Sequence, residues 1–357
     1  MKKSTILKIA ILLSCLFFYQ NSFTREYEIQ FKKVDFKGKL DYLLLKKAGI
    51  DKFIIRVFED DPVSGGLFFE NSVFRVKKSI LDRIIPDFNF NKLNLWTWMI
   101  TRKFSWIQDI HLYDMEYKDR ERRLIRKLDL FNPDAIKKII SVYKELALKK
   151  INGILIQDDL FIRHNEGFSN WGKAKFSEVM GLPFKKSLIM NRDTEYNSNW
   201  IQLKVNQVNK VLSLIVKECK RVNPRIKIGI NVYYETPVFV NRSEIWYAHN
   251  LRGIINTGID FVYLMSYHRQ IKKEMKLSEN GNRMLFKKIV ENAYEICKER
   301  LIVKIQVRDW DTREIIPLLE LRNYIRLIPK SIKKICFTPV EMEDFYYIKS
   351  IIKSDNG

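Results

Sequence analysis

Short apolar runs alternate with longer amphipathic segments along the chain from about residue 25 onward. Short runs rich in β-branched and aromatic side chains predict strands, whereas apolar residues spaced three and four apart predict helices. Eight strands are expected, at residues 27–34, 52–59, 92–99, 153–158, 226–234, 261–268, 301–310 and 332–340.

The segments between these runs carry helix signals. Residues 40–49 have helical spacing and end at Gly49, a residue common just after a helix. Asn132 and Pro133 have the order expected at a helix start, which predicts a helix from there to about residue 150. Further helices are predicted over 197–223, where the helix stops before Pro224, and over 243–258, and a long polar loop is predicted over 160–198.

A strand followed by a helix, repeated eight times, is typical of a (β/α)₈ barrel. We therefore predict an α/β fold with a single barrel domain over residues 26–350. An open doubly wound sheet is the alternative, but no glycine-rich phosphate loop follows its first strand. In a barrel the active site lies at the carboxyl ends of the strands, and the loop over 160–198 would lie on that face.

The chain is strongly basic, with 64 Lys and Arg residues against 42 Asp and Glu residues and a net charge of +22. A lysine-rich surface explains this charge, and so would a polyanionic partner or an anionic membrane surface. No zinc-finger spacing, RNP-like motif or arginine-rich tail is present, so nucleic acid is not expected as a partner.

Residues 1–23 have the form of an export signal, with Lys2 and Lys3 before a short apolar run that only Lys8 interrupts. Cys15 follows Leu-Leu-Ser, which resembles a bacterial lipobox, although the apolar stretch LFFY comes directly after it. A cleaved signal peptide, acylation of Cys15 and an uncleaved anchor all remain open. An exported protein is expected, in the periplasm or at the cell surface, and as an outer-membrane lipoprotein if Cys15 is acylated.

Metal and thiol chemistry are not predicted. The remaining cysteines, Cys219, Cys297 and Cys336, are widely spaced in apolar or helical contexts, which favours buried free thiols. The four histidines form no HxxxH or HExxH pair, so a zinc enzyme is not expected, and no cofactor fingerprint appears.

Carboxylates and aromatic side chains recur where the predicted strands end, most clearly at Asp158 and Asp159 after an apolar strand. Glycoside cleavage uses two carboxyl groups, and aromatic rings stack on the C–H faces of sugars. A single Asp after a strand is more often a helix cap, and a single Trp more often packs in the core. The recurrence of both types on most strand ends favours a sugar-cleaving site.

Six segments, in the same order, resemble a known family. They include GILIQDDLF, WTWM, LDLFNPDAIKK, NVYYETPVFVNRSEIWYAHNL, IQVRDW and FTPVEMEDF. From about residue 38 to 345 the chain is similar to the C-terminal hydrolase domain of PgaB-type exported enzymes, glycoside hydrolase family 153, which process poly-β-1,6-N-acetyl-D-glucosamine of biofilms. The resemblance implies a barrel that cleaves partly de-N-acetylated poly-glucosamine by an endo mechanism without a metal, here without the deacetylase domain.

The resemblance makes Asp158 and Asp159 the catalytic candidates. Because adjacent strand residues point to opposite faces, only one should enter the cleft, and we favour Asp159 as proton donor with Asp158 as its partner. The candidates for a second carboxylate are Asp309, Glu341 and Asp61. The candidates for sugar binding are Trp98, Asn231, Tyr233, Tyr267, Trp310 and Gln157.

Two departures from the family pattern leave other functions open. Gln157 replaces the family's His before the Asp pair, and FTPVEM stands where the family has YYPDDF. The alternatives are a non-catalytic polysaccharide-binding or export protein and a hydrolase of an acidic glycan. The expected partner is a polysaccharide, membrane contact is expected only through the N-terminal segment, and a monomer is expected.

Overall fold

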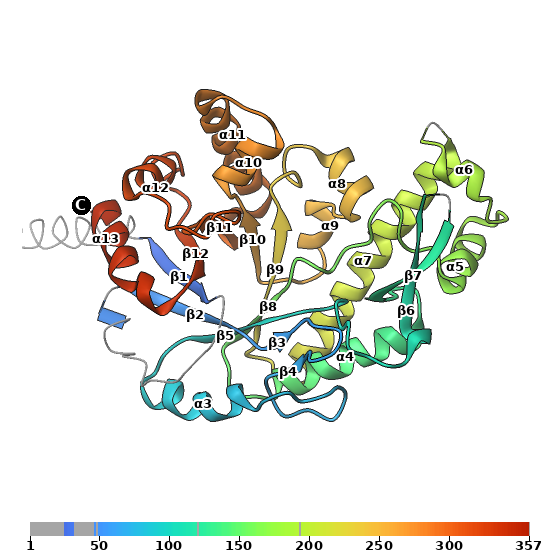
Figure 1. Cartoon of the computed structure of the whole chain (residues 1–357), viewed down its shortest axis with the longest axis horizontal. Helices are drawn as coiled ribbons and strands as arrows, with labels where there is room; N and C mark the ends of the chain where they lie inside the picture. The colour runs from blue at the N-terminus through green and yellow to red at the C-terminus, as the bar shows by residue number, and fades with distance from the viewer. Residues whose placement is uncertain (1–24, 32–45, 48, 120, 193, 357) are drawn as a thin grey trace, which may run out of the picture.

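Eight parallel strands close into a barrel, with helices between successive strands (Figure 1). The computed structural model describes residues 25–31, 46–47, 49–119, 121–192 and 194–356. The barrel strands are β1 (Glu26–Phe31), β2 (Ile50–Arg56), β5 (Leu95–Met99), β8 (Gly153–Ile156), β9 (Lys227–Tyr233), β10 (Phe261–Met265), β11 (Leu301–Gln306) and β12 (Lys334–Val340). This architecture confirms the predicted single-domain (β/α)₈ fold.

Among the described residues, helices surround the barrel, and the longer ones are amphipathic with mostly apolar residues on their buried side. They are α3 (Ile80–Phe90), α4 (Pro133–Ala147), α7 (Glu195–Val222), α8 (Val240–Tyr247), α9 (Leu251–Ile255), α10 (His268–Glu274), α11 (Glu279–Cys297), α12 (Leu318–Ile325) and α13 (Phe345–Asn356). Asn132 caps α4 as predicted, because its side chain accepts from the backbone N–H groups of Asp134 and Ala135.

Side chains fill the centre of the barrel, so it is a packed core and no pore. One inner layer consists of Ile54, Trp96, Leu155, Tyr263, Ile302 and Cys336, all almost fully buried. Gly153 and Gly229 leave room for this layer, since a Cβ on either glycine would lie within 3 Å of the Trp96 or Tyr263 ring. The layer nearer the carboxyl ends of the strands is polar, and this change from apolar to polar marks the floor of the site.

All eight predicted strands are present, but most end earlier than expected. The strand expected over 153–158 ends at Ile156, and the strand expected over 301–310 ends at Gln306. The polar residues that follow no longer pair with the neighbouring strands. They form the face of the barrel at the carboxyl ends of the strands. The periodicity therefore located the strands, whereas their ends are set by where the chain turns out of the barrel.

Two helix predictions need correction. The helix expected over 243–258 is broken into α8 and α9 at Ala248, which has a positive φ of 55°. The polar loop expected over 160–198 contains α5 (Asn170–Met180) and α6 (Lys186–Met190) and the start of α7. The buried aromatic ring of Phe176 packs there against Trp200 of α7, and such long-range contacts leave little trace in local periodicity. The helix expected over 40–49 lies largely outside the described residues.

An antiparallel hairpin, β6 (Tyr113–Lys118) and β7 (Glu121–Leu128), was not predicted and extends away from the barrel beside α5 and α6 (Figure 1). It is joined to the barrel by Arg102, which is fully buried and pairs with Asp114 at 2.7 Å and with Glu166 at 2.8 Å. Lys127 of β7 also pairs with Glu166, at 2.5 Å. This buried ion cluster connects the hairpin to the segment after β8.

The predicted signal segment and Cys15 lie outside the described residues. Within the part of the chain that the structure describes, no helix combines the length and the apolar character needed to cross a membrane.

Candidate functional site

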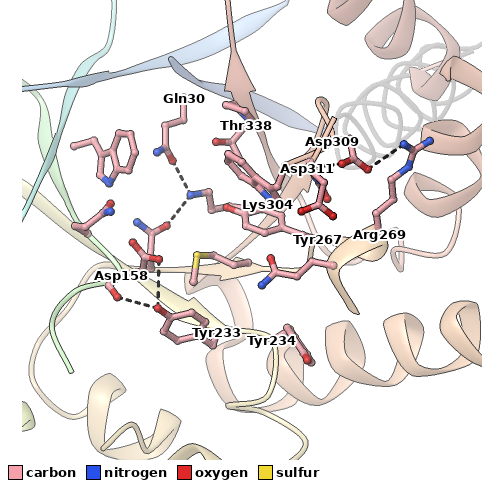
Figure 2. A pocket seen from close by; sticks show the side chains of 18 of the residues that line it. Gln30, Asp158, Tyr233, Tyr234, Tyr267, Arg269, Lys304, Asp309, Asp311 and Thr338 are labelled. Carbon is pink, nitrogen blue, oxygen red and sulfur yellow. Dashed lines mark hydrogen bonds and ion pairs between the residues drawn. The ribbon is translucent and has the colours of Figure 1, made fainter. Parts of the chain in front are cut away.

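A cavity of about 950 Å³ opens at the carboxyl ends of the barrel strands, where the predicted site residues converge (Figure 2). Eight predicted residues line it: Gln157, Asp158, Trp98, Asn231, Tyr233, Tyr267, Asp309 and Trp310. The strand ends thus bring together one of the two consecutive aspartates, one of the three second-carboxylate candidates and all six sugar-binding candidates.

Asp158 faces the cavity directly after β8 and is half-buried. The Tyr233 hydroxyl lies 3.2 Å from the Asp158 backbone oxygen and 3.4 Å from its carboxylate Oδ2, as Figure 2 shows. Burial and the nearby Asp158 charge raise the pKa of Tyr233 well above its usual value, so the tyrosine remains a hydrogen-bond donor. Asp158 is therefore held in place by a neutral donor while its carboxylate faces open space.

Asp159 does not enter the cavity, and this position contradicts the preference for it as proton donor. Its side chain is 1% exposed and points back toward the chain that follows β5. The carboxylate accepts from the backbone N–H groups of Thr101 at 2.9 Å, Arg102 at 2.7 Å and Lys103 at 2.8 Å. Burial raises the pKa of Asp159, and the three N–H donors oppose that rise. Asp159 fixes the backbone of residues 101–103.

The three candidates for a second carboxylate differ in position. Asp309 lines the cavity, but it pairs with Arg269 at 3.1 Å and accepts from the N–H groups of Asp311 and Thr312 (Figure 2). Asp61 lies in a turn, where its Oδ1 accepts from the N–H groups of Val63 and Ser64.

The third candidate, Glu341, caps the short helix η3 (Met342–Asp344) in a capping box and lies 3.7 Å from Arg308. Asp61 and Glu341 are not among the residues that line the cavity. Both have the local bonding of capping and turn residues, the ordinary role of a lone acid after a strand.

Lys304 lies on the cavity floor and was not predicted. Its ammonium nitrogen donates to Gln30 Oε1 at 2.6 Å and to Asn231 Oδ1 at 2.8 Å (Figure 2). The Asn231 amide nitrogen donates in turn to the Ile156 carbonyl, at 3.1 Å. Burial lowers the pKa of Lys304 to about 8, while the charge of Asp158 is one of the influences that raise it. At neutral pH the floor therefore carries a fixed positive charge.

The wall of the cavity combines aromatic rings with unpaired polar atoms. The Tyr267 and Trp310 rings lie 5.6 Å apart, and the Tyr233 ring stacks on Tyr247 at 4.1 Å. Buried polar atoms of four lining residues have no hydrogen-bond partner within the described chain: Arg56 Nε, Trp98 Nε1, Gln157 Oε1 and Gln306 Oε1. Buried polar groups are nearly always bonded, so these atoms are available to water or to the hydroxyl and amide groups of a ligand.

Three lining residues were missed because the prediction considered only residues near the expected carboxyl ends of the strands. Gln30, Lys304 and Gln306 lie within strands, below the rim of the barrel. The signal was nonetheless present, because Ile302, Lys304 and Gln306 alternate along β11, and a charge inside a buried strand is unusual. The other missed lining residues are Phe31, Arg56, Tyr234, Met265, Arg269, Gln270, Lys273, Glu274, Asp311, Thr338 and Pro339.

The buried charge of Lys304 has a measurable effect on stability. Its pKa falls from the ordinary 10.5 to about 8 on folding, so between these values the unfolded chain binds more protons than the folded chain. This residue therefore destabilises the fold below pH 8, and the loss is recovered as the pH rises from 8 to 10.5. Relative to Lys304→Met, the wild type should gain roughly 3 kcal/mol of unfolding free energy between about pH 7 and 10.5. Urea unfolding over this pH range tests this, and parallel curves for both proteins would contradict it.

In the described part of the chain, no three His, Cys, Asp or Glu side chains are grouped to hold a metal ion. The lining instead offers four carboxylates, of which Asp158 makes no ion pair within the described chain, together with cations, amides and rings. Such a set can bind a sugar chain and exchange a proton with it.

Comparison with known proteins identifies the family. A family model described as hypothetical glycosyl hydrolase family 13, GHL13, matches residues 40–337. The chain belongs to the GHL13 family. No match exists among curated protein sequences. As a GHL13 member, the chain is assigned to the glycoside hydrolases, in agreement with the prediction from its strand ends.

Solved structures share the fold of this GHL13 protein. The PgaB (BpsB) glycoside hydrolase domain from Bordetella bronchiseptica superposes with a TM-score of 0.74 at 18% identity, over 92% of this chain and 99% of that one. A catalytic mutant of the GH42 β-galactosidase Gan42B from G. stearothermophilus gives 0.66 at 12% identity, over 93% of this chain and 56% of that one. A β-galactosidase from the psychrophilic Marinomonas ef1 gives 0.64 at 11% identity, over 92% and 59%.

Proposed function

We propose that this protein is an exported endo-acting glycoside hydrolase that cleaves a β-1,6-linked, partly de-N-acetylated poly-glucosamine. The observation that carries the proposal is the Asp158 carboxylate in an aromatic-lined cavity at the carboxyl ends of the barrel strands. The matching glycosyl hydrolase family and the similarity in fold to the PgaB hydrolase domain support the same reaction class.

The charge of the cavity supports a substrate that carries some ammonium groups. Although the chain has a net charge of +22, the cavity is lined by four carboxylates and four cations. The carboxylates are Asp158, Glu274, Asp309 and Asp311, and the cations are Arg56, Arg269, Lys273 and Lys304. A locally balanced cavity can admit both the neutral N-acetylated and the cationic free-amine sugars of such a polymer.

In the proposed mechanism, the Asp158 carboxyl group protonates the glycosidic oxygen as the bond to the anomeric carbon breaks. A second group must then attack that carbon or stabilise its charge. Asp309 pairs with Arg269, Asp311 pairs with Lys273 at 2.7 Å, and Glu274 accepts from the Tyr234 hydroxyl and the Gln270 amide, so each of these carboxylates already has a partner within the protein. We therefore propose that the acetamido oxygen of the substrate itself attacks the anomeric carbon, as in substrate-assisted glycosidases.

The test is incubation of the purified protein with partly de-N-acetylated poly-β-1,6-N-acetyl-D-glucosamine, followed by mass spectrometry of the products. Shorter oligomers, absent with Asp158→Asn, are expected. Fully de-N-acetylated polymer should remain intact, because it lacks the attacking oxygen. Cleavage of that polymer would contradict substrate assistance but not hydrolysis itself.

Binding without cleavage is the second candidate function. It is favoured by one observation: among the described lining carboxylates, Asp309 and Asp311 are both paired with cations, which leaves few groups for acid–base work. In that case the polymer would bind in the cavity and keep its original length. It would also bind to the Asp158→Asn variant.

Gln157 lies next to Asp158 where the resembling family has His, and its Oε1 has no partner within the described chain. We expect Gln157→His to add an ionisation near about pH 6.5 to the dependence of kcat/KM on pH, because a histidinium would favour the charged form of the neighbouring carboxyl group. Gln157→Leu, which cannot titrate, is the matched control. Superimposable pH profiles for the two variants would show that residue 157 does not influence the reacting group.

A further inference from the structure

A second cavity, of about 550 Å³, lies at the opposite pole of the barrel, where the strands begin. Its floor is formed by Trp96, Phe261 and Lys52, whose ammonium nitrogen lies 4.1 Å from the Trp96 ring and 4.8 Å from the Phe261 ring. We call this end of the barrel the amino pole. It is remote from Asp158, which follows the carboxyl end of β8.

The lining of this cavity is strongly cationic. Six cations and a single carboxylate, Glu26, contribute to it. The cations are Lys52, Lys149, Lys150, Arg225, Lys227 and Lys334. The catalytic cavity has four of each sign, so the excess positive charge of the protein is not spread evenly over its two poles.

The six described loops that lead from a helix into a barrel strand extend this pattern around the amino pole. These loops are 91–94, 148–152, 223–226, 256–260, 298–300 and 326–333. They contain nine Lys or Arg residues and two acids, Asp260 and Glu299. The nine are Lys92, Lys149, Lys150, Arg225, Lys298, Arg300, Arg326, Lys330 and Lys333.

Three of the cavity cations are neutralised within the protein. Lys52 pairs with Glu28 at 2.5 Å, Lys149 with Asp82 at 2.6 Å and Lys227 with Asp260 at 3.2 Å.

For Lys150, Arg225 and Lys334, by contrast, no carboxylate lies within ion-pair distance among the described residues. Cations near helix ends stabilise the helix dipole, which explains part of the pattern. It does not explain a cavity into which unpaired cations from three separate segments converge.

The point at which residues 1–24 join the barrel indicates what the amino pole faces. Strand β1 begins at Glu26 on the amino pole, so residues 1–24, with their apolar run, are joined to the barrel at this end. Whether that run is an anchor or carries an acyl chain at Cys15, it would bring the amino pole toward a bilayer. Anionic phospholipid attracts Lys and Arg close to the surface, and the attraction extends about one Debye length.

We propose that the amino pole is a docking surface for anionic phospholipid, with Lys150, Arg225 and Lys334 receiving a lipid phosphate at its centre. Docking in this way directs the catalytic cavity away from the bilayer, since the two cavities lie at opposite ends of the barrel. The polymer then approaches from the aqueous side while the protein remains bound. Docking at this pole does not depend on the reaction that the catalytic cavity performs.

The test measures the partition of the full-length chain onto vesicles by sedimentation. Two lipid compositions are compared: phosphatidylcholine alone, and phosphatidylcholine with roughly 30% phosphatidylglycerol, an anionic share that gives a strong surface potential. The pole variant is Lys150→Glu, Arg225→Glu and Lys334→Glu. The control variant has the same charge change on exposed helix faces, Lys210→Glu, Lys217→Glu and Lys288→Glu. Both retain residues 1–24.

We expect the wild type and the control variant to bind the anionic vesicles at least roughly tenfold more strongly than the pole variant. The reason is that each cation near an anionic surface strengthens binding by about fivefold. This difference should vanish at about 0.5 M salt and on phosphatidylcholine alone. Equal weakening by the two variants would mean that overall charge alone matters, and no weakening by either would mean that the pole does not dock; each result overturns the proposal. If the pole variant does not fold, the Gln substitutions at the same three positions give the same comparison.

Discussion

Asp158→Asn is expected to lower kcat/KM for poly-glucosamine by about 10³-fold, within the range that general acid–base groups contribute. The amide is almost the same size as the carboxyl group but cannot donate a proton to the glycosidic oxygen. The Tyr233 hydroxyl can still donate to the amide oxygen, so the local geometry should persist. Oligomer release at several substrate concentrations gives kcat/KM, and titration calorimetry with the same polymer gives the affinity.

The affinity provides the control for this substitution. We expect the Kd to change by less than about threefold, because the aromatic wall and the floor around Lys304 are untouched. A variant that keeps most of its activity would show that Asp158 is not the proton donor. Loss of activity together with loss of binding would indicate that Asp158 holds the substrate and performs no chemistry on it.

Asp159→Ala is expected to lower the free energy of unfolding by about 3–5 kcal/mol, although the residue is adjacent to Asp158. The substitution leaves the buried N–H groups of Thr101 and Arg102 and the partly buried N–H group of Lys103 without their acceptor. Urea unfolding followed by circular dichroism measures the change. Asp158→Asn serves as the comparison, and it should shift the midpoint little because its side chain faces a cavity.

The opposite order of the two effects would contradict the assignment of the pair. If Asp159→Ala unfolds at the wild-type midpoint, its bonds to residues 101–103 contribute no stability. Activity is measured well below the unfolding midpoint, so that any loss in Asp159→Ala reports displacement of the neighbouring Asp158 and not unfolded protein.

The sequence was sufficient to predict the barrel because burial imposes a repeating pattern on every strand. It also predicted residues that line one cavity, since the ends of parallel strands meet at one face. Asp158 and Asp159 show what the sequence pattern cannot predict. Alternation along a strand predicted that only one of them enters the cavity, and only Asp158 lines it, but β8 ends at Ile156, two residues earlier than predicted, so neither aspartate lies within the strand.

Residues whose role depends on distant partners could not be predicted. The role of Lys304 depends on Gln30 from β1 and Asn231 from β9, and neither contact follows from local sequence. Asp61 and Glu341 are acids that follow strands, as Asp158 does, yet they cap a turn and a short helix. The chemistry of a carboxylate at a strand end is therefore decided by the backbone N–H groups that lie within its reach.

The buried ion cluster of Arg102, Asp114 and Glu166 links three segments far apart in the chain: the stretch after β5, the hairpin and the stretch after β8. Loss of Arg102 would leave two buried acids without their shared partner, and loss of Glu166 would leave both Arg102 and Lys127 with one partner fewer. A single substitution in the cluster is therefore expected to destabilise the fold and to give an unstable protein. We therefore expect the hairpin and the segment that follows the Asp158–Asp159 pair to change together in evolution rather than one at a time.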